Sequence, residues 1–100
     1  MDLREMQKVV YKNKVDKGFN VTDINKEFCL LYGEVAEAYE AWIKKKEDLG
    51  EELADIAIYL LGLSEILGVD LTPEIENKIE INQEREYKTI NGLLKRTSDR

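Results

Sequence analysis

The sequence of 100 residues contains no histidine and only one cysteine. Without histidine the chain cannot build Ser-His-Asp or Cys-His catalytic arrangements, or the commonest zinc sites. The sequence also has no glycine-rich phosphate-binding loop of the Walker or Rossmann type. Cys29 cannot form an internal disulfide, and its apolar neighbours predict a small buried side chain in a reduced, cytoplasmic protein. The chemistry that remains for an enzyme is mainly that of carboxylates with a metal ion.

Long apolar runs and positive charge are also scarce. The longest apolar run, Ile56 to Ser64, is far shorter than the roughly 20 residues that a membrane-spanning helix needs. Asp2 and Arg4 at the N-terminus do not fit a signal peptide. The net charge of −6 argues against a nucleic-acid partner, because phosphate backbones attract basic surfaces. A nucleotide is not excluded, since a bound metal ion inverts the local sign of an acidic site.

The apolar residues that are present recur at spacings of three and four, and no strand pattern was found. With 43% hydrophobic and 36% charged residues, the chain is predicted to be a single all-α domain, a four-helix bundle that dimerises through its helices. The domain core is expected at 23–87, with a loose tail at 97–100. The four helices are expected at about 3–16, 22–46, 49–67 and 72–87, the last with a tail that extends through Leu94.

Two of these helices carry extended apolar surfaces. From Ile24 to Trp42 the second helix has an apolar stripe that is expected to face the core. Trp42 is accordingly expected to pack, with stacking on a base as the alternative. The third helix is apolar nearly all round from Ile56 onward, so it is expected to pack against a partner subunit.

Two pairs of acidic residues lie beside these apolar surfaces. Glu34 and Glu37 are three residues apart on the second helix, and Glu52 and Asp55 repeat this spacing on the third. An antiparallel pairing of the two helices brings both pairs to similar heights, where four carboxylates repel one another unless a cation such as Mg²⁺ binds them. The alternative is ordinary solvated acids, because Asp and Glu make up 21 of the 100 residues.

The residues around these acids resemble a known family. The segments 33–38 (GEVAEA) and 51–56 (EELADI) are similar to the two metal-binding motifs, E-x-x-E and E-x-x-D, of the MazG-like nucleoside triphosphate pyrophosphohydrolases. Further along, Lys78, Asn82 and Arg85 resemble the K-x3-N-x2-R signature of the same superfamily. Each motif is short, but their joint order and spacing are specific.

The resemblance implies an enzyme that hydrolyses nucleoside triphosphates, often deoxynucleotides or non-canonical ones, to the monophosphate and pyrophosphate as nucleotide-pool housecleaning. Lys78, Asn82 and Arg85 are implied to bind the substrate. We assign Glu37 as the general base, a role that the sequence does not separate from metal binding. The implied cofactor is Mg²⁺, with Mn²⁺ as an alternative, held by Glu34, Glu37, Glu52 and Asp55.

Two other functions remain open at the sequence level. One is a phosphoribosyl-ATP pyrophosphohydrolase, an enzyme of similar fold. The other is a non-catalytic helical module that serves only for dimerisation or regulation. The complete set of four acids favours an active enzyme over the module, because a relic would be free to lose them.

Overall fold

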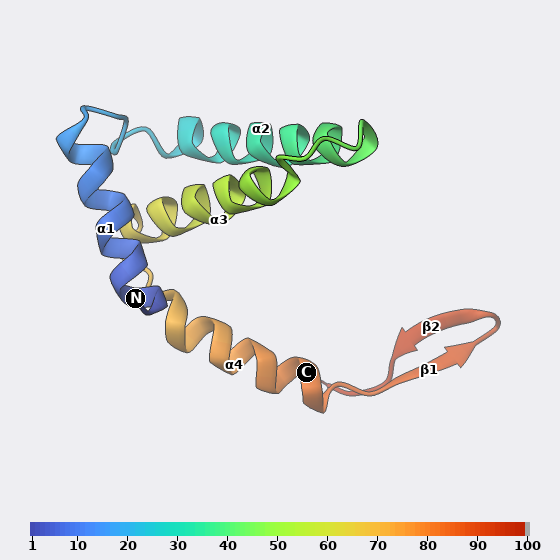
Figure 1. Cartoon of the computed structure of the whole chain (residues 1–100). Coiled ribbons are helices and arrows are strands. Elements are labelled where there is room, and N and C mark those ends of the chain that lie inside the picture. Colours follow the sequence, from blue (N-terminus) through green and yellow to red (C-terminus); the bar gives the residue numbers. More distant parts are fainter. Residues whose placement is uncertain (100) are drawn as a thin grey trace.

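The computed structural model describes residues 1–99 and contains four helices followed by a β-hairpin (Figure 1). The helices α2 and α3 form an antiparallel pair. The helix α1 crosses one end of this pair and packs against α3. From the end of α3 the chain leads away through α4 to the hairpin. The elements are α1 (Leu3–Asp16), α2 (Ile24–Ile43), α3 (Leu49–Ile66), α4 (Leu71–Glu84), β1 (Tyr87–Ile90) and β2 (Leu93–Arg96).

An aspartate precedes each of the four helices, and in three of them its side chain caps the helix. The side chains of Asp2, Asp23 and Asp70 each accept a hydrogen bond from a backbone N–H in the first turn of the helix that follows. Glycines with positive φ, Gly18 and Gly68, end α1 and α3. These local signals explain why the four predicted helices are confirmed, with boundaries that differ by only a few residues.

The core of the helical part is small and lies where α3 meets α1 and α2. Leu61 and Leu63 of α3 and the small residues Ala38 and Ala41 of α2 are its buried apolar side chains. The prediction that the apolar stripe of α2 faces the core holds for only part of the stripe: Ala38 is buried and Ile24 and Leu31 are half-buried, whereas Phe28 and Val35 are exposed. Trp42, at the end of the stripe, is 63% exposed. Cys29, predicted to be buried, is exposed as well.

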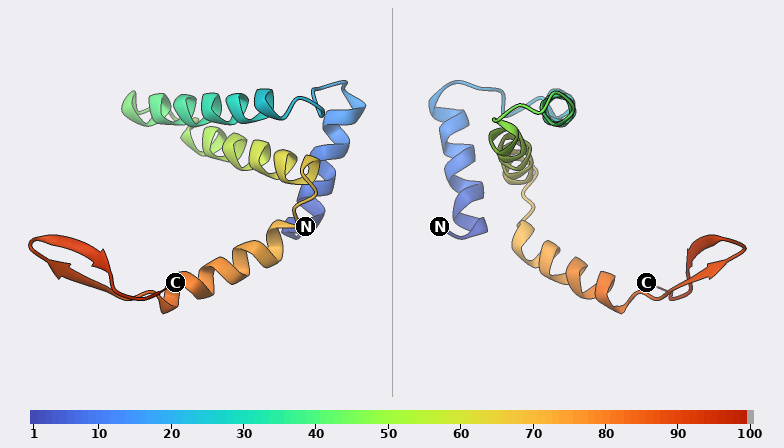
Figure 2. Two further views of the ribbon diagram at one scale, coloured as in Figure 1. Left: turned by 180° about the vertical axis from the view of Figure 1, so that it is seen from behind. Right: turned by 45° about the vertical axis from the view of Figure 1, so that its right-hand side comes forward.

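The start of α4 is fixed by hydrogen bonds from α1. The buried side-chain amide of Gln7 donates to the carbonyl of Val69 at 2.8 Å and accepts from the N–H of Leu71 at 2.9 Å. Arg4 Nε also donates to Asp70 Oδ2 at 2.7 Å. Because these contacts stop at the first turn, most of α4 extends away from the other helices (Figure 2).

A β-hairpin follows α4 and was not predicted from the sequence. The predicted helical tail through Leu94 is therefore wrong. The chain leaves the helix at Arg85, whose backbone is extended. Asn91 and Gly92 have φ of 53° and 79°, the conformation of a two-residue turn that joins antiparallel strands. Thr97 N–H then donates to Glu86 O at 2.7 Å across the base of the hairpin. The predicted loose tail included Arg100, which lies outside the described residues.

The resulting shape is open for a chain of this size. Its radius of gyration is 17.2 Å, whereas a compact chain of equal length has about 13 Å. It exposes 7658 Å² of surface, and a compact monomer of 11.6 kDa is expected to expose about 5,800 Å². None of the described helices is long and apolar enough to cross a membrane.

Candidate functional site

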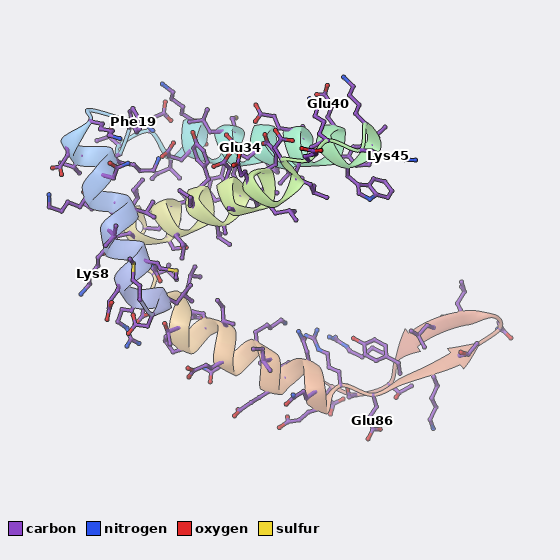
Figure 3. The ribbon with its side chains drawn as sticks, viewed as in Figure 1. Lys8, Phe19, Glu34, Glu40, Lys45 and Glu86 are labelled. Carbon is purple, nitrogen blue, oxygen red and sulfur yellow. The ribbon has the colours of Figure 1, made fainter. Side chains whose placement is uncertain are left out.

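The acidic residues of α2 and α3 converge where the two helices face each other. Glu34, Glu37 and Glu52 each place one carboxylate oxygen within 4.8 Å of the oxygens of the other two. Figure 3 labels Glu34 in this region, between the α2 and α3 ribbons. The predicted meeting of the two acid pairs is therefore observed for three of the four residues.

The position of this acid cluster follows from the helix periodicity. Residues three or four apart lie on one side of a helix, so Glu34 and Glu37 point in similar directions from α2. The next residues along that side are Ala38 and Ala41, whose small buried side chains allow α3 to come close. The carboxylates are thus held at the edge of the helix contact rather than in open solvent.

The fourth predicted residue, Asp55, lies beside the cluster. Its carboxylate is half-buried and is close enough for its charge to raise the pKa of both Glu34 and Glu52. Within residues 1–99, however, no Asp55 oxygen is among the carboxylate oxygens that lie within 4.8 Å of one another.

Burial and mutual repulsion both oppose ionisation of this cluster. Burial raises the pKa of Glu34 most, and the charges of Glu37, Asp55 and Glu52 raise it further. The pKa of Glu52 is also raised first by burial and then by Glu37 and Asp48. The Oε2 atoms of Glu34 and Glu52 are buried without a hydrogen-bond partner in the described chain. Hard divalent cations take carboxylate oxygens as ligands, so the residues present fit such an ion.

A second charged group lies further along the same helices and was missed from the sequence. Lys14 of α1 forms an ion pair with Glu27 Oε1 of α2, and the two residues are 7% and 2% exposed. The Lys14 ammonium also lies 5.0 Å from the ring centroid of Tyr59 on α3. Gly62 of α3 lies against this lysine: a Cβ there would lie 2.7 Å from Lys14 Cε, so a larger residue would displace the lysine side chain. The spacing pattern of a single helix does not show this pair.

Comparison with known proteins agrees with this fold and acid cluster. The sequence model of the MazG-like family matches residues 20–99. The chain belongs to the MazG-like family. Its fold is similar to the solved structure of a MazG-like pyrophosphohydrolase from cyanophage S-2L, bound to dGDP and three catalytic Mn²⁺ ions per active site. The two are 24% identical, the match covers 98% of this chain and 99% of the phage chain, and the TM-score is 0.72. No curated protein matches the chain.

The remaining predicted site residues of this MazG-like chain lie far from the acid cluster. Lys78 and Asn82 are on α4, and Arg85 follows its last turn, where Arg85 Nη1 donates to Asn82 Oδ1 at 3.3 Å. In the described chain the contacts of α4 are mainly with α1, and most of α4 extends away from the α2–α3 pair. The structure therefore brings these three residues near one another but does not bring them to the carboxylates of the same chain.

One part of the exposed apolar surface of this chain lies on the α2–α3 pair. Trp42 stacks on Tyr39 with ring centroids 6.2 Å apart, so it does not pack into the core as predicted. Val35 and Leu53 extend the same surface, which holds a groove of about 370 Å³. This apolar surface begins next to the acid cluster, because Val35, Tyr39 and Leu53 are one or two positions from a cluster residue, whereas Trp42 is five positions from Glu37.

Proposed function

We propose that this MazG-like chain is a metal-dependent pyrophosphohydrolase that cleaves nucleoside triphosphates between the α and β phosphates. The observation that carries the proposal is the cluster of Glu34, Glu37 and Glu52 with two buried, unpaired oxygens. A triphosphate is strongly anionic and approaches such a cluster only when cations lie between them. The similarity to a phage pyrophosphohydrolase that binds dGDP and Mn²⁺ supports the same chemistry.

Within this proposal the four acids hold Mg²⁺ or Mn²⁺. A bound divalent ion supplies charge neutralisation for the phosphates and lowers the pKa of a bound water. Of the three converging residues, Glu37 is exposed, whereas Glu34 and Glu52 are half-buried. Glu37 is therefore the carboxylate that an attacking water reaches most easily, and we assign it the role of general base, which accepts one proton from that water.

The proposal includes a second copy of the chain. Because α4 extends away from the acid cluster, Lys78, Asn82 and Arg85 would reach a cluster of this kind only on another subunit. The open shape and the apolar surface around Trp42 fit such a partner, since the surface exposed beyond that of a compact monomer is about 1,800 Å². We infer a homodimer, or a tetramer built from it, in the cytoplasm.

The test is pyrophosphate release from a panel of substrates. The four common dNTPs, the four NTPs and phosphoribosyl-ATP are each incubated with Mg²⁺, with Mn²⁺ and with chelator. Release from at least one nucleoside triphosphate is expected with metal and not with chelator. Glu37→Gln is expected to lower the rate by about a hundredfold or more, the range for loss of a general base. Glu47→Gln, in the exposed α2–α3 turn, is the matched control and is expected to keep the wild-type rate.

Two outcomes would replace the proposal. Cleavage of phosphoribosyl-ATP alone would identify the chain as that related enzyme. No metal-dependent release from any of the triphosphates would identify a non-catalytic helical module. In that second case Glu37→Gln and the wild type would be indistinguishable in every assay.

A further inference from the structure

The junction between α3 and α4 is held by one buried side chain of α1. Gln7 is 1% exposed, and both its amide nitrogen and its amide oxygen are hydrogen-bonded. The nitrogen donates to Glu65 Oε2 at 3.3 Å and to Val69 O at 2.8 Å, and the oxygen accepts from the N–H of Leu71 at 2.9 Å. These partners belong to the last turn of α3, the connecting turn and the first residue of α4. A single amide of α1 therefore joins all three segments.

A second contact from α1 holds the residue that caps α4. Arg4 lies three residues before Gln7, on the same side of α1, and its Nε donates to Asp70 Oδ2 at 2.7 Å. The other carboxylate oxygen of Asp70 accepts from the N–H of Thr72 at 3.1 Å and so caps α4. We call the contacts of Arg4 and Gln7 with this junction the α1 latch. The latch joins α1, which precedes the stretch 20–99 of the family model, to α4 within that stretch.

Apolar packing contributes little to the direction of α4. The helix has no buried residue, and its contacts are mainly with α1 at its first turn. A cavity of about 240 Å³ also lies beside the junction, lined by Arg4, Gln7 and residues of the turn. Because close packing is sparse here, the hydrogen bonds of the α1 latch are the main contacts that set the direction in which α4 leaves the other helices (Figure 2).

A change of direction at this junction grows along α4. Arg85 lies 14 residues beyond Leu71, which corresponds to about 21 Å along a helix. Tilting α4 by about 15° at its base would therefore move Arg85 by about 5 Å. A misplacement of about 1 Å at a reacting centre is enough to lower a rate about a hundredfold. The position of Arg85 thus depends strongly on contacts that lie far from it.

We propose that Gln7 is a positioning residue for the reaction. Through the α1 latch it fixes the direction of α4, and α4 places Lys78, Asn82 and Arg85 against the acid cluster of a second copy of the chain. The inference rests on the proposed function, which assigns these three residues to the substrate. The Gln7 amide is buried in contacts with its own chain, so it acts on the reaction only through α4.

The direction of α4 can be measured without turnover. Nitroxide labels are attached to the exposed Cys29 of α2 and to Glu80→Cys on α4, and labelled chains are diluted with unlabelled ones so that only distances within a chain are read. Double electron–electron resonance is expected to give a narrow distance distribution for the otherwise wild-type chain. Gln7→Leu keeps the approximate size of the side chain and removes its hydrogen bonds, and it is expected to broaden or shift the distribution by several ångströms. An unchanged distribution would overturn the proposal.

Two further variants control this measurement. Lys8→Leu places the same side chain at the next, exposed position of α1 and is expected to keep the narrow distribution. Arg4→Ala removes the exposed part of the α1 latch, leaves the Asp70 cap in place and is expected to broaden the distribution less than Gln7→Leu does. Arg4→Lys keeps the positive charge and is expected to restore it. If Gln7→Leu does not fold, an Arg4→Ala distribution as narrow as that of the wild type would reject the role of the α1 latch.

Turnover distinguishes failure of this inference from failure of the proposed function. In an active enzyme Gln7→Leu is expected to lower kcat about tenfold and to keep the rise in melting temperature on addition of Mg²⁺, because the acid cluster lies on α2 and α3. An unchanged kcat would reject Gln7 as a positioning residue. An inactive wild type in which Gln7→Leu still disturbs α4 would reject the hydrolase proposal and retain the role of Gln7 in directing α4.

Heterodimers purified through different tags on co-expressed chains show which site Gln7 serves. With Gln7→Leu on one chain and Glu37→Gln on the other, one site combines an intact acid cluster with a correctly placed α4, so about half of the wild-type rate is expected. With both substitutions on one chain and a wild-type partner, one site is inactive and the other is weakened, and about a twentieth of the wild-type rate is expected. Equal rates, or rates in the reverse order, would overturn the proposal.

Discussion

The body of the molecule, α1 to α3, and the arm, which comprises α4 and the β-hairpin, differ in how they bury their residues. The body contains all of the buried side chains, including the Lys14–Glu27 pair. The arm contains none: α4 has no buried residue and both strands are exposed along their length. The body is thus stabilised by its own packing, whereas the arm packs little within the single chain and, in the dimer that we propose, would depend on contacts with the partner.

The chemical character of the arm indicates what these contacts are. A two-stranded hairpin is at best marginally stable in water without a covering surface. Ile75, Ile79 and Leu94 are exposed along the arm and offer apolar surface to a partner. Residues 85–96 also carry four basic side chains against one acidic one, in a chain of net charge −6. In the dimer that we propose, these features of the arm would complement both the apolar surface and the acid cluster of another body.

The largest expected effect comes from mixing an inactive and a weakened kind of subunit. Glu37→Gln is expected to inactivate the body, and Arg85→Ala is expected to lower the rate about tenfold by removing a charge-assisted contact to phosphate from the arm. A heterodimer of the two variants, purified through different tags on co-expressed chains, contains one site built from two intact parts. Its expected rate is about half that of the wild type, because a twofold dimer has two sites.

The rate of the heterodimer distinguishes sites that are complete within one chain from sites that combine the body of one chain with the arm of the other. If each site were complete within one chain, the heterodimer would contain one dead and one weakened site, with about a twentieth of the wild-type rate. That value would refute the exchange of arms between subunits. The Glu47→Gln and Arg85→Ala heterodimer serves as the control, because its surface substitution leaves both acid clusters intact.

A smaller effect is expected in how the stability of the body depends on pH. Glu34 and Glu52 have pKa values raised above the usual 4.5 in the folded state. Their protonation therefore stabilises the fold fully below pH 4.5, and this contribution is lost as the pH rises through the raised pKa values. Without metal, the melting temperature is expected to fall more between mildly acidic and neutral pH in the wild type than in Glu34→Gln.

Metal should reverse this loss in the wild type. At a hundredfold excess over its dissociation constant, Mg²⁺ adds about 2.7 kcal/mol to the free energy of unfolding, and the gain is largest where the acids are ionised. Glu40 and Asp70 have lowered pKa values and shift stability in the opposite direction, so the comparison with Glu34→Gln isolates the cluster. Equal melting curves for both proteins, with chelator and with Mg²⁺, would contradict a crowded metal site.

The body was easier to predict from sequence than the arm. Spacing alone placed Glu34, Glu37 and Glu52 on facing sides of two helices, since helical periodicity is local. The hairpin was missed although Asn91-Gly92 is a strong turn signal, because the apolar residues nearby also fit a helix. The α2 stripe was assigned to the core because periodicity identifies an apolar side but not the surface that covers it. Burial of Lys14 depends on Gly62 of another helix, which no local pattern shows.

The smallest effect is expected at the turn between α2 and α3, which sets the register of the acid cluster. The residue that follows the end of α2 has the same left-handed backbone conformation as the glycines that follow α1 and α3. Here, however, that residue is Lys45, with a φ of 53°. The left-handed conformation costs a non-glycine residue about 1–2 kcal/mol. Lys45→Gly removes that cost and adds a smaller entropic one in the unfolded chain. The variant is expected to gain about 0.5 kcal/mol in urea unfolding, with an unchanged denaturant dependence. A loss of stability would show that Lys45 makes a contact in the assembled protein that outweighs its backbone strain.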